Sequence, residues 1–344
     1  MRKWFGKGWI FVVLLVVMFL VSVRSVDAKS GDDAVSITIS AAGDCTLGVD
    51  SRYNNQFNKY YKANNAAYFF QKVKSVFSKD DLTIVNMEGT LTTSTKRAKK
   101  KFTFKGPTKY ANILKKGSVE VVNIANNHTK DFGNKGYTQT KKSLKKYGIA
   151  YSGNGTIAYK KVKGVKVAFV GFNTINNKLS SSSVKRTIKK ARKKGAAIII
   201  ASFHWGVEGS KKPNSTQKKL AHTAVNAGAT LVLGHHPHVL QGVEKYKGRY
   251  IVYSLGNFCF GGNRNPSDKD TMIFQQTFTV SASGEVAKDK NAKVIPCSIS
   301  GKTTTNTFQP RVLSGSSKKR VMKKMNNMSR KLGLTFNSSG KAKK

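Results

Sequence analysis

The chain has 344 residues and a formal net charge of +46, from 62 lysines and arginines against 16 aspartates and glutamates. This length is enough to bury a substantial core in one large domain or in two. The lysines are spread along the whole chain without a helix-turn-helix, RNP or zinc-finger pattern, so nucleic acid is not the expected partner, and three cysteines, an odd number, define no disulfide framework.

Residues 1–28 have the pattern of a signal peptide. A basic start is followed by an unbroken apolar run from Trp9 to Leu20, and Val26–Ala28 resembles a small-residue cleavage site. The run is near the upper length of a signal peptide and short for a membrane span, so the segment is either removed or kept as an N-terminal anchor. Both alternatives predict an extracytoplasmic protein, secreted or anchored to the outer face of the cytoplasmic membrane.

Strands and helices then alternate along the chain, which predicts an α/β fold with a largely parallel core sheet. The expected strands in this part are Ser36–Ala41, Leu82–Val85, Val119–Ile124, Ala158–Lys163, Val165–Phe172, Ala196–Phe203 and Thr230–Leu233. The expected helices are Ala66–Phe77, Tyr110–Lys116, Tyr137–Tyr147, Val184–Lys194 and Thr216–Asn226.

A β-rich closing segment follows, in which no helix separates the expected strands Tyr250–Leu255, Thr271–Val280 and Ala292–Ile299. These elements predict one domain over residues 35–300. The remaining residues, 301–344, have the composition of a basic tail, in which Val321–Leu332 is the expected helix.

Five expected strands are each followed by a side chain that can bind a metal ion. These side chains are Asp44, Glu88, His128, His204 and the histidines of the run His235-His236-Pro237-His238. Three of the six histidines of the chain fall in that run. Because the functional crevice of an α/β protein lies outside the carboxyl ends of its strands, these side chains are expected to share one site.

The expected ligands combine carboxylate, amide and imidazole groups, a mixture that suits Mn, Fe or Zn. They are Asp44, Glu88, Asn127, His204, His236 and His238. Two such ions joined by a bridging carboxylate orient a water molecule and stabilise both oxygens of a displacement at phosphorus. His128 is the expected general acid for the leaving group. The alternative, a histidine held by a structural hydrogen bond, is the expectation for His222.

Four more residues are expected to act around these ligands. Glu208, four residues after His204, either holds an imidazole, carries acid/base chemistry, or forms a loop salt bridge with lysine. Trp205 is expected to pack over the site, because an indole ring contributes mostly buried area. Ser254 and Asn257 are expected to fix the loop that carries the site.

Six motifs stand in a fixed order along the chain. They are Gly43-Asp44, Asn86-Met87-Glu88, Asn127-His128 with Asp131-Phe132-Gly133, His204-Trp205-Gly206-Val207-Glu208, Gly234 to Val239, and Ser254-Leu255-Gly256-Asn257-Phe258. Each motif alone is weak, but their combination over Ile37 to Phe260 resembles the CapA family of capsule-synthesis proteins. That family is associated with bacterial poly-γ-glutamate production, and its fold is similar to the calcineurin-like metallophosphoesterases. The resemblance therefore implies a four-layer αββα sandwich.

The phosphoesterase pattern carries over position by position. Asp44 matches the aspartate of the first motif, Asp-x-His, and Glu88 stands where the second motif supplies a bridging aspartate. The later motifs, an Asn-His pair, a lone histidine and a final His-x-His, match Asn127 and His128, His204, and His236 and His238.

Two features depart from that pattern. Thr46 stands in place of the histidine of the first motif, which removes one metal ligand. Glu88 replaces a shorter aspartate, and Glu120 and Glu208 have no counterpart. These departures favour a mononuclear or modified metal site.

The resemblance and the charge together predict an exported protein that acts in the synthesis, export or attachment of an anionic surface polymer, most simply poly-γ-glutamate. A lysine-rich surface suits such a polymer, a wall polymer or an anionic membrane surface, and capsule-synthesis membrane subunits are the expected protein partners. The expected reaction is metal-assisted hydrolysis or transfer at a phosphoester or a γ-glutamyl amide. Two alternatives stay open: a non-catalytic polyanion-binding assembly subunit with the same fold, and a phosphoesterase that acts on wall or lipid phosphates.

Overall fold

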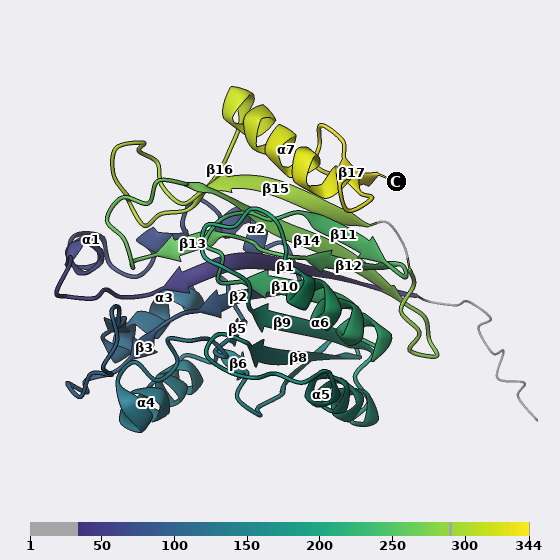
Figure 1. Ribbon diagram of the computed structural model, residues 1–344, viewed down its shortest axis with the longest axis horizontal. Helices are drawn as coiled ribbons and strands as arrows, with labels where there is room; N and C mark the ends of the chain where they lie inside the picture. The colour runs from purple at the N-terminus through teal and green to yellow at the C-terminus, as the bar shows by residue number, and fades with distance from the viewer. Residues whose placement is uncertain (1–33, 289–290, 344) are drawn as a thin grey trace, which may run out of the picture. The chain divides into compact units, whose positions relative to one another are not determined.

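The computed structural model of the protein describes residues 34–288 and 291–343 (Figure 1). The predicted signal peptide or anchor, residues 1–28, lies outside these residues. Within them, no helix combines the length and the apolar character needed to cross a lipid bilayer.

Two β-sheets form the centre of the fold. The strands of the first sheet are β1 Val35–Thr46, β2 Leu82–Met87, β5 Val121–Asn123, β6 Ala150–Ser152, β13 Asn257–Phe260, β14 Asp270–Val280, β15 Ala292–Ser298 and β16 Arg311–Val312. Their order is β16-β15-β14-β1-β2-β5-β6, with β13 paired to β1. Strands β1, β2, β5 and β6 are parallel, whereas β14, β15 and β16 extend the sheet in the antiparallel sense.

The second sheet contains β7 Ala158–Val162, β8 Val165–Asn173, β9 Ile198–His204, β10 Leu231–His235, β11 Val243–Tyr246 and β12 Arg249–Val252, in the order β11-β12-β10-β9-β8-β7. Its four central strands are parallel, and β7 and β11 pair antiparallel at the two edges. Two pairs of short strands lie outside both sheets: β3 Thr90–Leu91 with β4 Lys105–Gly106, and β17 Thr335–Phe336 with β18 Ala342–Lys343.

Helices cover the outer face of each sheet (Figure 1). Those on the first sheet are α1 Gln56–Asn64, η1 Tyr68–Phe70, α2 Lys74–Phe77, η2 Thr108–Tyr110, α3 Ala111–Lys116 and α4 Gly133–Lys146. Those on the second sheet are α5 Ser181–Lys193 and α6 Ser215–Asn226. The last helix, α7 Gly315–Arg330, contacts β15 of the first sheet and β11 of the second.

Side-chain alternation along the strands explains these layers. In β9, Ile198 and Ile200 face the core between the sheets, whereas Ile199 and Ala201 face the α5 and α6 layer. Because both faces of such a strand are covered, it reads as a continuous apolar run. The layers are therefore helix, sheet, sheet and helix, and the predicted αββα sandwich is confirmed.

The expected helix Ala66–Phe77 is wrong. The segment contains the short elements η1 and α2, and between them Val73 has a φ of −125°, outside the helical region. Its closely spaced aromatic residues Phe69, Phe70 and Phe77 are all buried, so packing and not helical periodicity decides the backbone. The preceding helix α1 was not expected, because Phe57 is its only buried residue and leaves no apolar period in the sequence.

Residues 301–343 contribute to the core. The side chains Val321, Met322 and Met325 of α7 join the apolar cluster between the sheets. On the same helix, Arg320 lies 2.6 Å from a carboxylate oxygen of Asp270 on β14. Apolar and ionic contacts thus attach α7 to the sandwich.

Candidate metal centre

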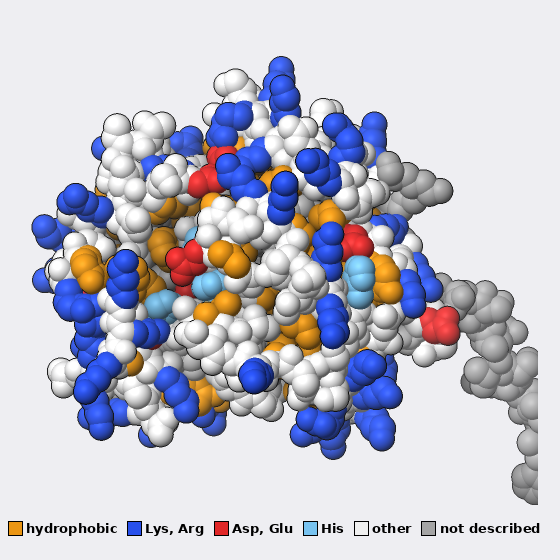
Figure 2. Space-filling view, viewed as in Figure 1, with side chains coloured by type: hydrophobic (Ala, Val, Ile, Leu, Met, Phe, Trp, Pro, Cys, Tyr) orange, Lys and Arg blue, Asp and Glu red, His pale blue; other side chains and the backbone are white. Residues whose placement is uncertain are grey.

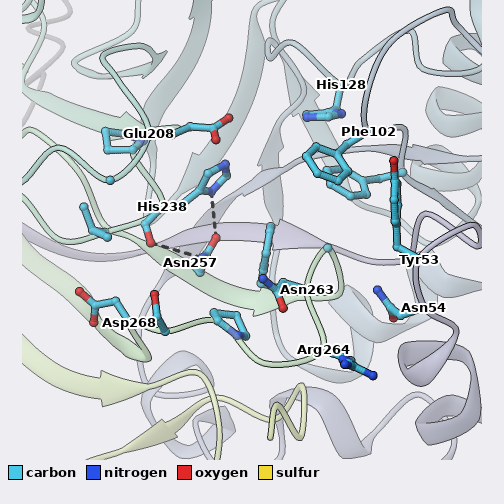
Figure 3. Close-up of a pocket in the computed structure, with 18 residues that line it drawn as sticks. Tyr53, Asn54, Phe102, His128, Glu208, His238, Asn257, Asn263, Arg264 and Asp268 are labelled. Atoms are coloured by element: carbon cyan, nitrogen blue, oxygen red, sulfur yellow. Dashed lines mark hydrogen bonds between the residues drawn. The ribbon is translucent and has the colours of Figure 1, made fainter.

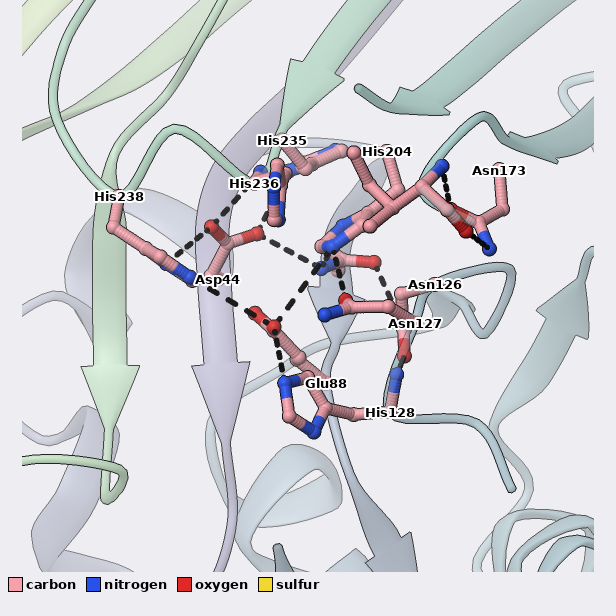
Figure 4. A network of polar contacts seen from close by, with 12 residues as sticks. Asp44, Glu88, Asn126, Asn127, His128, Asn173, His204, His235, His236 and His238 are labelled. Atoms are coloured by element: carbon pink, nitrogen blue, oxygen red, sulfur yellow. Dashed lines mark hydrogen bonds and ion pairs between the residues drawn. The ribbon is translucent and has the colours of Figure 1, made fainter. Parts of the chain in front are cut away.

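The carboxyl ends of β1, β2, β9 and β10 bring polar side chains together (Figure 4). Asp44 lies near the end of β1, Glu88 directly follows β2, and His204 and His235 are the last residues of β9 and β10. His236 follows immediately, and its N–H donates to Asp44 Oδ2 at 3.2 Å although the two residues are 192 positions apart. The two sheets thus assemble one site from distant segments.

Gly43 allows the close approach that places Asp44. A Cβ atom at this position would lie 1.9 Å from the carbonyl oxygen of Gly256, closer than any side chain tolerates. The Asp44 N–H donates to that same oxygen at 2.9 Å. Glycine before Asp44 is therefore required by the packing of β1 against the loop that precedes β13.

Two groups of side chains have potential ligand atoms close enough to hold an ion. One group is Asp44, Glu88 and His204, the other is Glu88, His236 and His238, and within each group these atoms lie within 4.8 Å of one another. Glu88 belongs to both groups, as a carboxylate that bridges two ions must. The donor set of carboxylate oxygens and imidazole nitrogens suits a divalent first-row ion such as Mn, Fe or Zn.

One oxygen of Glu88 lies among three imidazoles. Its Oε1 is 3.6 Å from His128 Nε2, 3.8 Å from His204 Nε2 and 3.9 Å from His238 Nε2. These separations are too long for hydrogen bonds. Two ligands that each lie about 2.1 Å from a shared ion are separated by roughly 3 to 4 Å, so the spacing of Glu88 from His204 and His238 fits metal coordination.

Several buried polar atoms of the centre have no hydrogen-bond partner among the described residues. They are both carboxylate oxygens of Glu88, both ring nitrogens of His235 and Nδ1 of His236. Glu88 is fully buried, and an unpaired buried polar group costs about 1–3 kcal/mol, with more for a charged one. A bound cation would satisfy the Glu88 carboxylate, so the residues present fit a metal ion.

Burial sets the protonation state of the histidines. It lowers the pKa of His204 well below its usual range and the pKa of His236 to about 4, so both rings are neutral, the form that binds metal. Burial also lowers the pKa of His238, but the carboxylates of Glu88 and Asp44 outweigh it and raise that pKa to about 10. Burial raises the pKa of Glu88 to about 8. The metal-free centre thus keeps protons on both Glu88 and His238 at neutral pH, and a bound metal cation would replace them.

The loop after β10 holds two of these histidines in the left-handed backbone region. The φ angle is 95° at His236 and 58° at His238. Such conformations of non-glycine residues cost on the order of 1–3 kcal/mol and concentrate at functional sites. Asp44 stabilises the loop, because its Oδ2 lies 3.2 Å from His238 Nδ1. Burial alone would raise the pKa of Asp44, but its contacts with His235 and His238 hold that pKa well below its usual range.

Buried asparagines orient the ligands, and sequence reasoning missed most of them. Asn86 Nδ2 donates to Asp44 Oδ1 at 2.8 Å and lies 3.3 Å from His204 Nδ1. Asn123 Nδ2 in turn donates to Asn86 Oδ1 at 2.9 Å. Asn127, an expected ligand, places its Oδ1 2.8 Å from His204 Nε2. The available signal for Asn86 and Asn123 was an amide side chain at the end of an apolar strand.

His128 reaches the centre from the loop after β5. Its Nδ1 lies 2.8 Å from Asp131 Oδ2, which directs Nε2 toward Glu88 (Figure 4). Lys100 Nζ lies 2.5 Å from the other carboxylate oxygen of Asp131 and donates to the carbonyl oxygen of Asn127 at 2.8 Å. Burial lowers the pKa of His128, and Asp131 opposes that shift. Neither Lys100 nor Asp131 was given a role from the sequence, yet both fix the ring expected to act as general acid.

A cavity of about 490 Å³ opens beside the ligands (Figure 3). His128, His238 and the exposed carboxylate of Glu208 line it. Tyr53 and Phe102 also line it, although they are 56% and 40% exposed, and their rings meet edge to face with centroids 5.2 Å apart. On the visible face, histidine and acidic side chains lie in a central hollow, with lysines and arginines around it (Figure 2).

Asn257 and Ser254 hold the loop that carries His238. Asn257 Oδ1 lies 2.9 Å from His238 Nδ1, and Ser254 Oγ donates to the carbonyl oxygen of Val239 at 2.7 Å. Ser254 Oγ also accepts a hydrogen bond from the Gly256 N–H at 3.2 Å. Ser254 contacts the chain around the ligands, whereas Asn257 also lines the cavity (Figure 3).

Trp205 lies away from the ligand groups, whereas Thr46 and Glu88 line the same small internal gap. Trp205 follows His204 at the end of β9, and because successive strand residues point to opposite faces, its ring stacks on Phe203 beneath the α5 and α6 layer. It does not pack over the site as expected. Thr46 is buried, and its Oγ1 has no hydrogen-bond partner in the part of the chain that the structure describes.

The sequence matches proteins of capsule synthesis. The family model described as bacterial capsule synthesis protein PGA_cap matches residues 38–262. The chain is 33% identical over 275 residues to the PGA biosynthesis protein CapA of Bacillus subtilis (strain 168), a match that covers 73% of this chain and 70% of that protein. It is 31% identical over 278 residues to the capsule biosynthesis protein CapA of Bacillus anthracis, a match that covers 73% of this chain and 66% of that protein.

Among solved structures, the 5'-nucleotidase from Candida albicans SC5314 is similar to this chain, with a TM-score of 0.44 and 13% sequence identity over 87% of this chain and 58% of that one. The sequence matches extend through the ligands from Asp44 to His238. The expectation drawn from the motifs is confirmed, and the chain belongs to the bacterial capsule synthesis proteins of the CapA family.

Proposed function

We propose that this protein acts in the synthesis, export or attachment of an anionic capsule polymer, most simply poly-γ-glutamate, through a metal-dependent hydrolase-type site. The observation that carries the proposal is Glu88. It is fully buried, its carboxylate lacks a hydrogen-bond partner among the described residues, and it belongs to two groups of potential ligands beside an open cavity. The link to the polymer comes from the relatives named for PGA and capsule biosynthesis.

The proposed chemistry divides between the cation and the side chains. A divalent ion held by Asp44, Glu88, Asn127 and the three ligand histidines would polarise a carbonyl or phosphoryl oxygen and lower the pKa of a bound water. In its imidazolium form, His128 would donate the Nε2 proton to the departing nitrogen or oxygen, while its Nδ1–H stays hydrogen-bonded to Asp131. An amide substrate needs this proton most, since its leaving group is an amine. Glu208, exposed in the cavity, is the second acid/base candidate.

The cavity suits a chain that carries negative charge. Lys101 is exposed on the loop that ends at Phe102, and Arg264 lines the other part of the cavity (Figure 3). The Arg264 guanidinium makes no ion pair with any residue in the ranges 34–288 and 291–343. Exposed cations and aromatic rings at the mouth can contact carboxylates and the planar amides of a polymer outside the reacting bond.

Location and partners follow from the same proposal. Residues 1–28 would direct the chain across the cytoplasmic membrane, where it is either released or held at the outer face. A protein held there would meet the growing polymer and the membrane subunits of capsule synthesis. The high positive charge of the chain would favour contact with both polymer and anionic lipid.

A non-catalytic role is the second candidate, and Thr46 is the observation that favours it. A threonine at this position supplies no imidazole to the centre. On that reading the fold binds and positions the polymer, and binding would not depend on the metal.

The test is turnover of the purified chain, reconstituted with Mn²⁺, on poly-γ-glutamate and on bis(p-nitrophenyl) phosphate. We expect new amino groups from the polymer, and loss of this activity in His128→Ala while the metal stays bound. His222→Ala is the matched control, because His222 lies on α6 and pairs with Glu244 at 2.9 Å. Turnover of the phosphodiester alone would identify a phosphoesterase. Polymer binding without turnover, unchanged by chelation, would identify the assembly subunit.

A further inference from the structure

Exposed lysines lie in the turns that lead into the amino ends of six sheet strands. Lys79 precedes β2, Lys115 and Lys116 precede β5, Lys145 and Lys146 precede β6, Lys163 precedes β8, Lys193 and Lys194 precede β9, and Lys247 precedes β12. These nine lysines define a face that we call the base. Because the strands concerned are parallel within each sheet, their amino ends lie at the side of the fold opposite the ligands.

Two contacts show that both sheets and the start of the described chain share this face. Lys163 Nζ donates to the carbonyl oxygen of Ser36, the second residue of β1, at 2.9 Å. Lys166 Nζ, at the start of β8, donates to the carbonyl oxygen of Lys194 after α5 at 2.8 Å. The base is therefore also the face where β1 begins.

Two of these lysines occupy positions that lysine does not favour. Lys163-Gly164 and Lys247-Gly248 are two-residue hairpin turns with φ angles of 47° and 82°, and of 49° and 80°. The first position of such a turn favours asparagine, aspartate or glycine. The helix dipole can explain lysines at the carboxyl ends of helices. It does not explain lysines in hairpin turns, so positive charge is the property that the helix ends and the hairpins of the base have in common.

Acidic residues of the base neutralise little of this charge. Asp81 pairs with Lys163 at 2.9 Å, and burial raises the pKa of Asp80 to about 6 and that of Glu120 to about 7. Glu285 is exposed in the hairpin between β14 and β15. The lysine pairs at the ends of α3, α4 and α5 make no ion pair with a described residue.

The cationic surface continues along α5. A groove of about 560 Å³ there is lined by seven residues, six of them cations: Ser182, Lys185, Arg186, Lys189, Lys190, Lys193 and Lys194. No carboxylate lines it. A broad surface of one charge favours an extended anionic partner over a small ligand.

The base and the metal centre lie at opposite ends of β1. Val35 starts the strand and Asp44 lies nine residues later, which corresponds to about 30 Å at the rise of an extended strand. The apolar run that ends at Val23 is joined to Val35 by a chain that can extend at most about 40 Å. A tether of this length would allow a retained N-terminal anchor and the base to contact the same membrane.

We propose that the base docks on an anionic lipid bilayer and so directs the metal centre away from the membrane. A lysine close to an anionic bilayer gains about 1 kcal/mol, or roughly a fivefold factor in occupancy. Docking by the eight base lysines that make no ion pair with a described residue would fix the orientation of the domain, and the cavity would open about 30 Å above the lipid surface.

The test is lysine acylation of the full chain reconstituted in vesicles, read by mass spectrometry. We expect the base lysines to react at least about fivefold more slowly on vesicles with phosphatidylglycerol than on pure phosphatidylcholine, and to recover in high salt. Lys319 and Lys323 on α7 and Lys101 at the cavity should react equally on both. Equal reactivity of the base on both vesicles, or protection of Lys101 instead, would overturn the proposal.

A charge-matched pair of variants sharpens this test. One carries Lys145, Lys146, Lys193 and Lys194 changed to Gln, and the control carries Lys218, Lys219, Lys319 and Lys323 changed to Gln. On vesicles with phosphatidylglycerol, the remaining base lysines of the first variant should react as fast as they do on neutral vesicles. The base lysines of the control variant should still react more slowly on the anionic vesicles. If the two variants lose protection equally, net charge and not the base is responsible. If soluble poly-γ-glutamate protects the base as well as anionic vesicles do, the partner is a polymer and the lipid proposal fails.

Discussion

Replacing Glu88 by glutamine should change the stability of the protein in opposite directions with and without metal. In the metal-free protein this carboxyl is fully buried, and burial raises its pKa from 4.5 to about 8. The unfolded chain therefore loses the proton as the pH rises above 4.5, while the folded chain keeps it until about pH 8. Folding stability of the metal-free protein falls over this range, by about 3 kcal/mol at pH 7.

Glutamine has nearly the same shape and no charge, so it removes this pH-dependent cost. We expect Glu88→Gln to raise the melting temperature of the chelated protein at pH 7 by several degrees and to leave it almost unchanged at pH 4. With saturating Mn²⁺ or Zn²⁺ the order should reverse. A ligand at about one thousand times its dissociation constant stabilises the native state by about 4.1 kcal/mol, more than the cost of the buried carboxylate, and the variant lacks the carboxylate shared by both ligand groups.

The assay is thermal unfolding of both proteins at pH 4 and pH 7, after chelation and after metal addition. Asp81→Asn, at a carboxylate paired with Lys163 far from the ligands, serves as the control and should show no metal-dependent reversal. The reasoning is refuted if Glu88→Gln lowers the melting temperature equally in chelated and metal-loaded protein. In that case Glu88 would be a structural acceptor.

Three other predictions follow from single contacts. His128→Ala should lower turnover by about 10²–10⁴-fold with metal content unchanged, as measured by kinetics beside elemental analysis. Burial alone would raise the pKa of Asp270, but hydrogen bonds from Arg320 and Lys324 outweigh it and lower that pKa. Asp270 should therefore contribute stability above about pH 4 that is lost as the pH falls through its folded pKa. In urea unfolding at a series of acidic pH values, Asp270→Asn should reduce this loss of stability by at most about 1 kcal/mol. Gly43→Ala should destabilise the fold by about 1–3 kcal/mol or more in urea unfolding and weaken metal binding, because its Cβ would lie 1.9 Å from a carbonyl oxygen; an unchanged midpoint would show that β1 relaxes freely.

The strand ends were predictable from the sequence because two local signals coincide there. An apolar run predicts a buried strand, and a polar residue directly after the run predicts the edge of the sheet at which the site lies. Asp44, Glu88 and His204 are examples. Parallel pairing then brings these ends together without further information. The fold class followed from the same alternation and from the resemblance of the motifs.

What the sequence did not predict depends on tertiary contacts. Lys100 reaches Asp131 from a loop 31 positions earlier in the chain, and no local pattern marks such a pair. Phe69 and Phe70 are both buried although they are adjacent, and they form a short 3-10 helix in place of the expected long helix, because tertiary burial overrides helical periodicity. The expected position of Trp205 was wrong for a different reason. Trp205 directly follows His204 at the end of β9, so strand alternation turns the two side chains to opposite faces of the sheet.

Metal content of the purified full chain, beside His236→Ala, His238→Ala and the control His222→Ala, tests the central claim most directly. The account predicts stoichiometric metal in the wild type and in His222→Ala after reconstitution with Mn, Fe or Zn. It predicts loss of that metal in the two loop variants while circular dichroism shows them folded. No bound metal in the wild type with any of the three ions, or metal retained in both loop variants, would contradict the account.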